Sequence, residues 1–221
     1  MERHHFEDEL QRLKARLLNM AGLVEERAHQ AIRALVERRA ELAQKVIAGD
    51  KEINELQIDI DDRALKLLAL QNPLASDLRL ITAAMKINAD LERIGDQAVN
   101  IAEHTQKLLR LPLLKPLIDI PRMAEMAEGM VRDSLDAFVN KDAELARRVL
   151  ARDDDVDSLK DQLFRELLTY MMADPATIER ALALILVSRS IERIADHATN
   201  IAEDVVFVVE AKDVRHHHEE G

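Results

Sequence analysis

The chain has 221 residues, of which 48% are hydrophobic and 33% charged, enough for one large domain or two small ones. It contains no cysteine, which excludes disulfides, thiolate zinc sites and thiol nucleophiles. Its formal net charge of −11 disfavours nucleic acid as a partner. Because the N-terminus lacks a signal-peptide pattern and no apolar run reaches the roughly 18 residues of a membrane span, we expect a cytoplasmic protein.

Helix-forming residues dominate the composition. Only five glycines, five prolines and 2% aromatic residues interrupt it, which predicts an all-α fold. Gly49-Asp50 predicts the first helix break, and Asn72-Pro73 and Asp174-Pro175 each predict a later turn. Three prolines between residues 111 and 121 predict a linker. The predicted helices span approximately residues 9–48, 51–71, 77–110, 122–151, 154–173 and 177–212.

The two halves of the chain repeat each other. Residues 92–103 read ERIGDQAVNIAE and residues 192–203 read ERIADHATNIAE, with nine of twelve positions identical. Residues 40–50 and 143–153 share seven of eleven positions, in the same order and at nearly the same spacing. This pattern indicates an internal duplication.

Three helices in each half, joined by short connections, favour antiparallel packing of neighbouring helices. The fold prediction is therefore two tandem three-helix bundles of the spectrin-like type. The first bundle takes residues 1–110, the linker residues 111–121 and the second bundle residues 122–221.

One side of a helix in each half gathers oxygen-bearing side chains. At 100° per residue, a narrow stripe of the first half contains Glu92, Asp96 and Asn100. The second half repeats this stripe with Glu192, Asp196 and Asn200. The preceding helix of each half adds further carboxylates, namely Asp50 in the first and Asp153, Asp157 and Asp161 in the second.

An acidic stripe is usually a solvated helix face, and three features favour metal binding instead. Asparagine is a poor residue for a merely solvated helix, the stripe is not interleaved with lysine, and it recurs in both halves. Oxygen-only ligands suit hard cations such as magnesium, manganese, calcium or iron. Closely spaced carboxylates on one side could bridge several ions. Arg93 and Arg193 flank the stripes and are interpreted as charge-balancing residues.

Signatures of catalysis are missing from the sequence. There is no P-loop, dinucleotide-binding glycine motif or nucleophile elbow. Glu26 and His29 form one Glu-x-x-His, whereas ferritin-type di-iron bundles use two facing ones. We therefore expect a non-enzymatic protein. A carboxylate-bridged metalloenzyme and a purely structural bundle with solvated acidic faces stay open as alternatives.

Several segments resemble the PhoU family, and the resemblance covers essentially the whole chain. They are Gly49-Asp50-Lys51, Ser76-Asp77-Leu78-Arg79, Leu91-Glu92-Arg93-Ile94-Gly95-Asp96, Tyr170-Met171-Met172, the block from Arg189 to Asp196, and Asp213-Val214-Arg215-His216. Two positions depart from the family pattern. Ala195 replaces a usual glycine, and Asn54 stands where an acidic residue is common.

The resemblance implies a cytoplasmic homodimer that is a negative regulator of phosphate uptake and phosphate-responsive signalling. It implies contacts with the ATPase subunit of the phosphate ABC transporter (PstB) and with a sensor histidine kinase (PhoR). It also implies multinuclear clusters of iron, zinc or other metals, held by E/D-x-x-x-D motifs. Those motifs match Glu92 with Asp96, Glu192 with Asp196, and Asp153, Asp157 and Asp161 on the adjacent helix.

Overall fold

The structure is a computed structural model that describes residues 2–71, 73, 75–212 and 214. Over these residues it is helical and contains no strand, which confirms the all-α prediction. The first half forms α1 (Glu2–Val36), α2 (Ala40–Gln71) and α3 (Ala75–Leu108). The second half forms α4 (Asp119–Asn140), α5 (Ala143–Leu150), α6 (Asp153–Ala173), the 3-10 helix η1 (Pro175–Thr177) and α7 (Ile178–Glu210).

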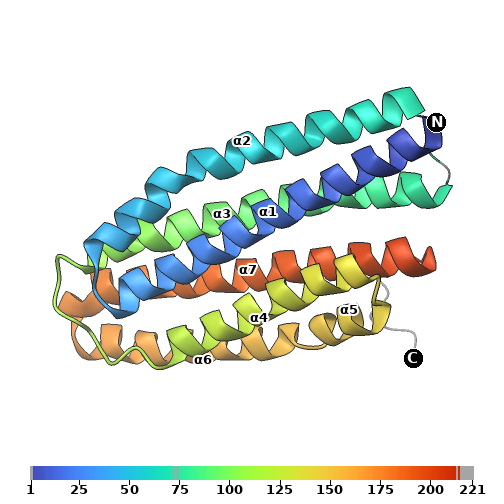
Figure 1. The fold of residues 1–221 in the computed structure, drawn as a ribbon. Coiled ribbons are helices and arrows are strands. Elements are labelled where there is room, and N and C mark those ends of the chain that lie inside the picture. Colours follow the sequence, from blue (N-terminus) through green and yellow to red (C-terminus); the bar gives the residue numbers. More distant parts are fainter. Residues whose placement is uncertain (1, 72, 74, 213, 215–221) are drawn as a thin grey trace.

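The helices of each half lie side by side as a bundle, and the two bundles pack against each other along their long sides (Figure 1). In the second bundle α5 and α6 together take the place that α2 has in the first. The most extensive contact between the halves joins α3 to α7, which run antiparallel (Figure 1). One apolar core continues through both bundles, and it includes Ile87 and Ile94 of α3 and Val187 and Ile191 of α7. None of the described helices has the length and apolar character that crossing a bilayer requires.

The predicted helix break at Gly49 and Asp50 is wrong, because α2 runs through both residues. A Cβ atom at Gly49 would lie 2.5 Å from Nε of Arg27, so the glycine makes room for the guanidinium of α1. The second half makes the same kind of contact with the roles exchanged. There a Cβ atom at Gly129 of α4 would lie 2.8 Å from Nη2 of Arg152. Gly49 therefore allows α1 and α2 to pack closely and does not end a helix.

The turn after the first helix of each half uses a left-handed residue that is not glycine. Arg38 and Lys141, which are 103 residues apart, both have a φ of 53°. The next amide in each half donates to the carbonyl five residues back, over 2.9 Å in both cases. The predicted single helix over residues 122–151 is therefore interrupted. A new helix, α5, starts at Ala143. The side chain of the preceding Asp142 accepts a hydrogen bond from the Leu145 amide at 2.9 Å and so caps α5.

Residues 109–118 connect the two halves, and side chains from both halves hold this segment. Arg38 donates to the carbonyls of Leu109 at 3.1 Å and Leu111 at 2.8 Å. Arg180 of α7 donates to the carbonyl of Pro112 at 3.3 Å. The buried Lys115 pairs with Glu166 of α6. Because a proline is tolerated in the first turn of a helix, α4 starts at residue 119 and includes Pro121, earlier than the predicted residue 122.

Candidate functional site

In each half, two neighbouring helices bring polar side chains together on one surface. The first face lies on α2 and α3 and consists of Asp50, Asn54, Glu92 and Asp96, and Gln57 is counted with it by its position in the repeat. The second face lies on α6 and α7 at the matching positions and consists of Asp153, Asp157, Lys160, Glu192 and Asp196. Both faces therefore combine the acidic stripe of the last helix with the carboxylates predicted on the helix before it.

The first face contains oxygen atoms that are buried from solvent and accept no hydrogen bond from the described residues. Asn54 donates from Nδ2 to Asp50 Oδ2 at 2.8 Å. Asp50 Oδ1 and Asn54 Oδ1 are buried and have no hydrogen-bond partner in the described part of the chain. Partial burial, with the nearby Asp96 carboxylate, raises the pKa of Glu92, and burial beside Asp50 raises the pKa of Asp96. The charge of Arg93 opposes the shift of Glu92 without cancelling it, so the first face is short of positive charge.

The second face contains a lysine within its carboxylates. Lys160 Nζ lies 2.7 Å from Asp157 Oδ1 and 3.0 Å from Glu192 Oε1, so it links α6 to α7. Burial opposes the ammonium form, but these two hydrogen bonds raise the pKa of Lys160. Even so, burial and the charges of Glu192, Asp153 and Asp157 raise the pKa of Asp196 to about 6. Burial and Asp157 also raise the pKa of Asp153.

In the described part of the chain, three of the predicted ligands make no hydrogen bond to a member of either face. Asn200 of α7 donates to Asp90 Oδ1 at 3.2 Å, which places it at the contact between the halves. Asn100 donates to Gln97 Oε1 of its own helix at 3.3 Å. Asp161 is exposed, and it is not among the charges that raise the pKa of Asp153 or Asp196.

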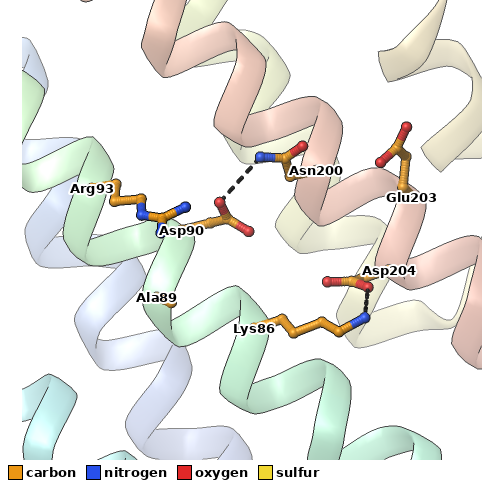
Figure 2. Close-up of a pocket in the computed structure, with 7 residues that line it drawn as sticks. All are labelled: Lys86, Ala89, Asp90, Arg93, Asn200, Glu203 and Asp204. Carbon is orange, nitrogen blue, oxygen red and sulfur yellow. Dashed lines mark hydrogen bonds and ion pairs between the residues drawn. The ribbon is translucent and has the colours of Figure 1, made fainter. Parts of the chain in front are cut away.

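The contact between α3 and α7 is a third polar site, which the sequence did not predict. Figure 2 shows Asn200 reaching Asp90 and Lys86 reaching Asp204. These residues line an open pocket with a volume of about 230 Å³. Asp90 is buried, and its Oδ1 also lies 2.9 Å from Nδ1 of His197. Lys86 Nζ lies 2.9 Å from Asp204 Oδ1. Together these pairs tie the two bundles to each other.

Comparing the halves hides this contact, because its two carboxylates are not repeated. The positions that match Asp90 and Asp204 hold Ser190 and His104. The Glu-x-x-His motif of Glu26 and His29 also makes a contact between halves. His29 Nδ1 lies 3.4 Å from Glu128 Oε2 of α4.

The donor chemistry of both faces fits a hard cation, because every candidate ligand is a carboxylate or an amide oxygen. The unpartnered oxygens of Asp50 and Asn54 support this fit. Within the described residues, no three His, Cys, Asp or Glu side chains already converge as a ligand set. Closing either face around an ion would therefore require rotation of side chains.

Comparison with known proteins gives matches along nearly the whole chain. The family model described as the PhoU domain matches twice, at residues 17–105 and 120–205. A protein of Pseudomonas putida named "Phosphate-specific transport system accessory protein PhoU homolog" is 42% identical, over 96% of this chain and 85% of that protein. The protein of the same name from Aquifex aeolicus is 45% identical, over 95% of both.

Solved structures show the same architecture. The crystal structure of PhoU from Pseudomonas aeruginosa matches with a TM-score of 0.91 and 40% identity, over 94% of this chain and all of that chain. The phosphate transport system regulatory protein PhoU from Streptococcus pneumoniae matches with a TM-score of 0.88 and 31% identity, over 95% and 99%. The double match and these structures confirm two tandem helical repeats.

Proposed function

The chain belongs to the PhoU family, and from this membership we propose that it is an accessory protein of phosphate-specific transport. In this role it lowers phosphate uptake and phosphate-responsive signalling when phosphate is plentiful. The observation that carries the proposal is the match of both repeats, over nearly the full length, to proteins named for that system.

We propose that the protein acts by binding other proteins and catalyses no reaction of its own. Its partners in the cytoplasm are the ATPase subunit of the phosphate ABC transporter and a sensor histidine kinase, and it acts as a homodimer. The side chains of the two faces support this role, because they are carboxylates and amides with a lysine and include no nucleophile paired with a base.

We further propose that the faces bind metal ions such as manganese, magnesium, iron or zinc. The raised pKa values of Glu92, Asp96 and Asp196 support this part of the proposal, because burial and neighbouring carboxylates cause them and a nearby cation would offset both effects. The metal would supply positive charge at the surface of each bundle, and Glu92 and Asp96, with Glu192 and Asp196, would hold it.

The accessory role is tested by expressing the chain in a bacterium that lacks its own PhoU protein. A phosphate-starvation reporter and phosphate uptake are measured in phosphate-rich medium, and both are expected to fall. The purified chain is also expected to retain the transporter ATPase and the kinase in a pull-down. Unchanged reporter and uptake, with neither partner retained, would refute the accessory role.

A further inference from the structure

The two faces differ at two of their five matched positions. The first face has the neutral pair Asn54 and Gln57 where the second has the charged pair Asp157 and Lys160. Each change of charge compensates the other, so both faces carry the same formal charge of −3. The first face reaches this value with three carboxylates, and the second with four carboxylates and one ammonium group.

In the second face, the ammonium group already sits where a cation would bind. Lys160 Nζ lies within hydrogen-bond distance of Asp157 on α6 and of Glu192 on α7. Among the described residues, the buried oxygens without a hydrogen-bond partner include none from the second face. A tethered cation therefore satisfies two of the four carboxylates of this face, Asp157 and Glu192.

No member of the first face carries a positive charge. The contact between α2 and α3 contains buried oxygen atoms that accept no hydrogen bond from the described residues. Asp50 Oδ1 and Asn54 Oδ1 are buried and unpartnered. Asn88, four residues before Glu92 on the same side of α3, is fully buried and donates to Asp61 Oδ1 at 2.9 Å. Its own Oδ1 is also unpartnered in the described part of the chain. Burying acceptors beside carboxylates is unfavourable unless a donor or a cation joins them.

We propose that the two faces are unequal metal sites: the first face binds a divalent cation, and Lys160 competes for the same oxygens in the second. The inference rests on the metal binding put forward under Proposed function. Lys160 is then the residue that sets the affinity of the second face, and Gln57 is its permissive counterpart in the first.

The test uses the full chain, stripped of metal with a chelator and titrated with Mn²⁺. Equilibrium dialysis with mass spectrometry counts the bound metal, and circular dichroism verifies that each variant is helical. Asp96→Asn removes a ligand of the first face, and Asp196→Asn removes one of the second. Lys160→Gln introduces the residue of the first face, and its matched control Lys160→Arg keeps the positive charge.

The tighter Mn²⁺ site is expected to be lost in Asp96→Asn and kept in Asp196→Asn. Lys160→Gln is expected to tighten the second site by about tenfold, the value of two hydrogen bonds to a charged group at a partly exposed position, whereas Lys160→Arg leaves it weak. The reciprocal double variant Asn54→Asp with Gln57→Lys is expected to weaken the first site by about as much.

Equal Mn²⁺ affinity at the two faces, or loss of the tight site in Asp196→Asn, overturns the inference and leaves metal binding itself intact. An identical second site in Lys160→Gln and Lys160→Arg also overturns it. Absence of bound Mn²⁺ in every variant overturns the inference together with the proposed metal binding. The reporter assay for the accessory role is independent of all these outcomes.

Discussion

Asp196 is a carboxylate whose ionisation is expected to destabilise the metal-free protein. Burial and the neighbouring charges of Glu192, Asp153 and Asp157 raise its pKa to about 6. Replacing it by asparagine removes this charge and keeps the size of the side chain. We therefore expect Asp196→Asn to stabilise the metal-free fold near neutral pH.

The sign follows from proton linkage. In the unfolded chain the pKa of this carboxyl is about 4, so between about pH 4 and pH 6 the folded state binds more protons than the unfolded state. The free energy of unfolding falls as pH rises through this window and stays lower above it. A shift of about 2 pH units corresponds to about 3 kcal/mol, which solvent screening of a partly exposed group reduces to about 1 kcal/mol.

The assay is thermal unfolding of the full chain in chelator, at about pH 4.5 and about pH 7.5. For a chain of this length, about 1 kcal/mol corresponds to a rise in Tm of about 3 °C, which is expected at the higher pH only. Asp161→Asn is the matched control, because Asp161 is an exposed carboxylate on α6, and no change is expected. An unchanged or lowered Tm for Asp196→Asn at the higher pH, or an equal rise at both, would refute the reasoning.

Four other predictions concern stability and are measured by urea unfolding followed by circular dichroism. Gly22→Ala, in open space on α1, is expected to stabilise by about 1 kcal/mol. Gly49→Ala is expected to stabilise by less, because the new Cβ displaces Arg27. In a chain that already carries Arg27→Ala, Gly49→Ala is expected to stabilise by as much as Gly22→Ala. Equal stabilisation by the two variants in the presence of Arg27 would contradict this packing. Asp142→Ala, which removes the cap of α5, costs about 1 kcal/mol. Ile94→Ala, in the fully buried core, costs about 2–5 kcal/mol, and a cost below about 1 kcal/mol would show that the site is not close-packed.

The fold could be predicted because the repeat and the proline positions agree with each other. Duplicated blocks at nearly constant spacing require two similar units, and long helices between turn signals leave few other arrangements. The helix break at Gly49 could not be predicted, because a glycine that admits a guanidinium looks the same in sequence as one that ends a helix. The true turns use Arg38 and Lys141 with positive φ, a conformation that these residue types seldom adopt.

The acidic faces could be predicted in part for a related reason. Carboxylates repeated in both halves, such as Asp96 and Asp196, stand out when the halves are compared. Lys160 and Asp90 do not, because each occurs in one half only. Lys160 meets Glu192 of the next helix, and Asp90 meets His197 of the other bundle, so both contacts depend on how the helices pack. Asn200 was assigned to the acidic stripe by helical angle alone, but in the structure it donates a hydrogen bond to Asp90 of the neighbouring bundle.

The segment between the bundles has a mechanical consequence. Arg38 and Arg180 hold its backbone from opposite bundles, and Lys115 fastens its far end to α6. Because residues 109–118 are held at several points, a displacement of one bundle is expected to be passed on to the other. The protein is therefore expected to respond to force as one stiff rod, about 50 Å long by the rise of the 35 residues of α1. A partner that pulls on one bundle would move the other with it.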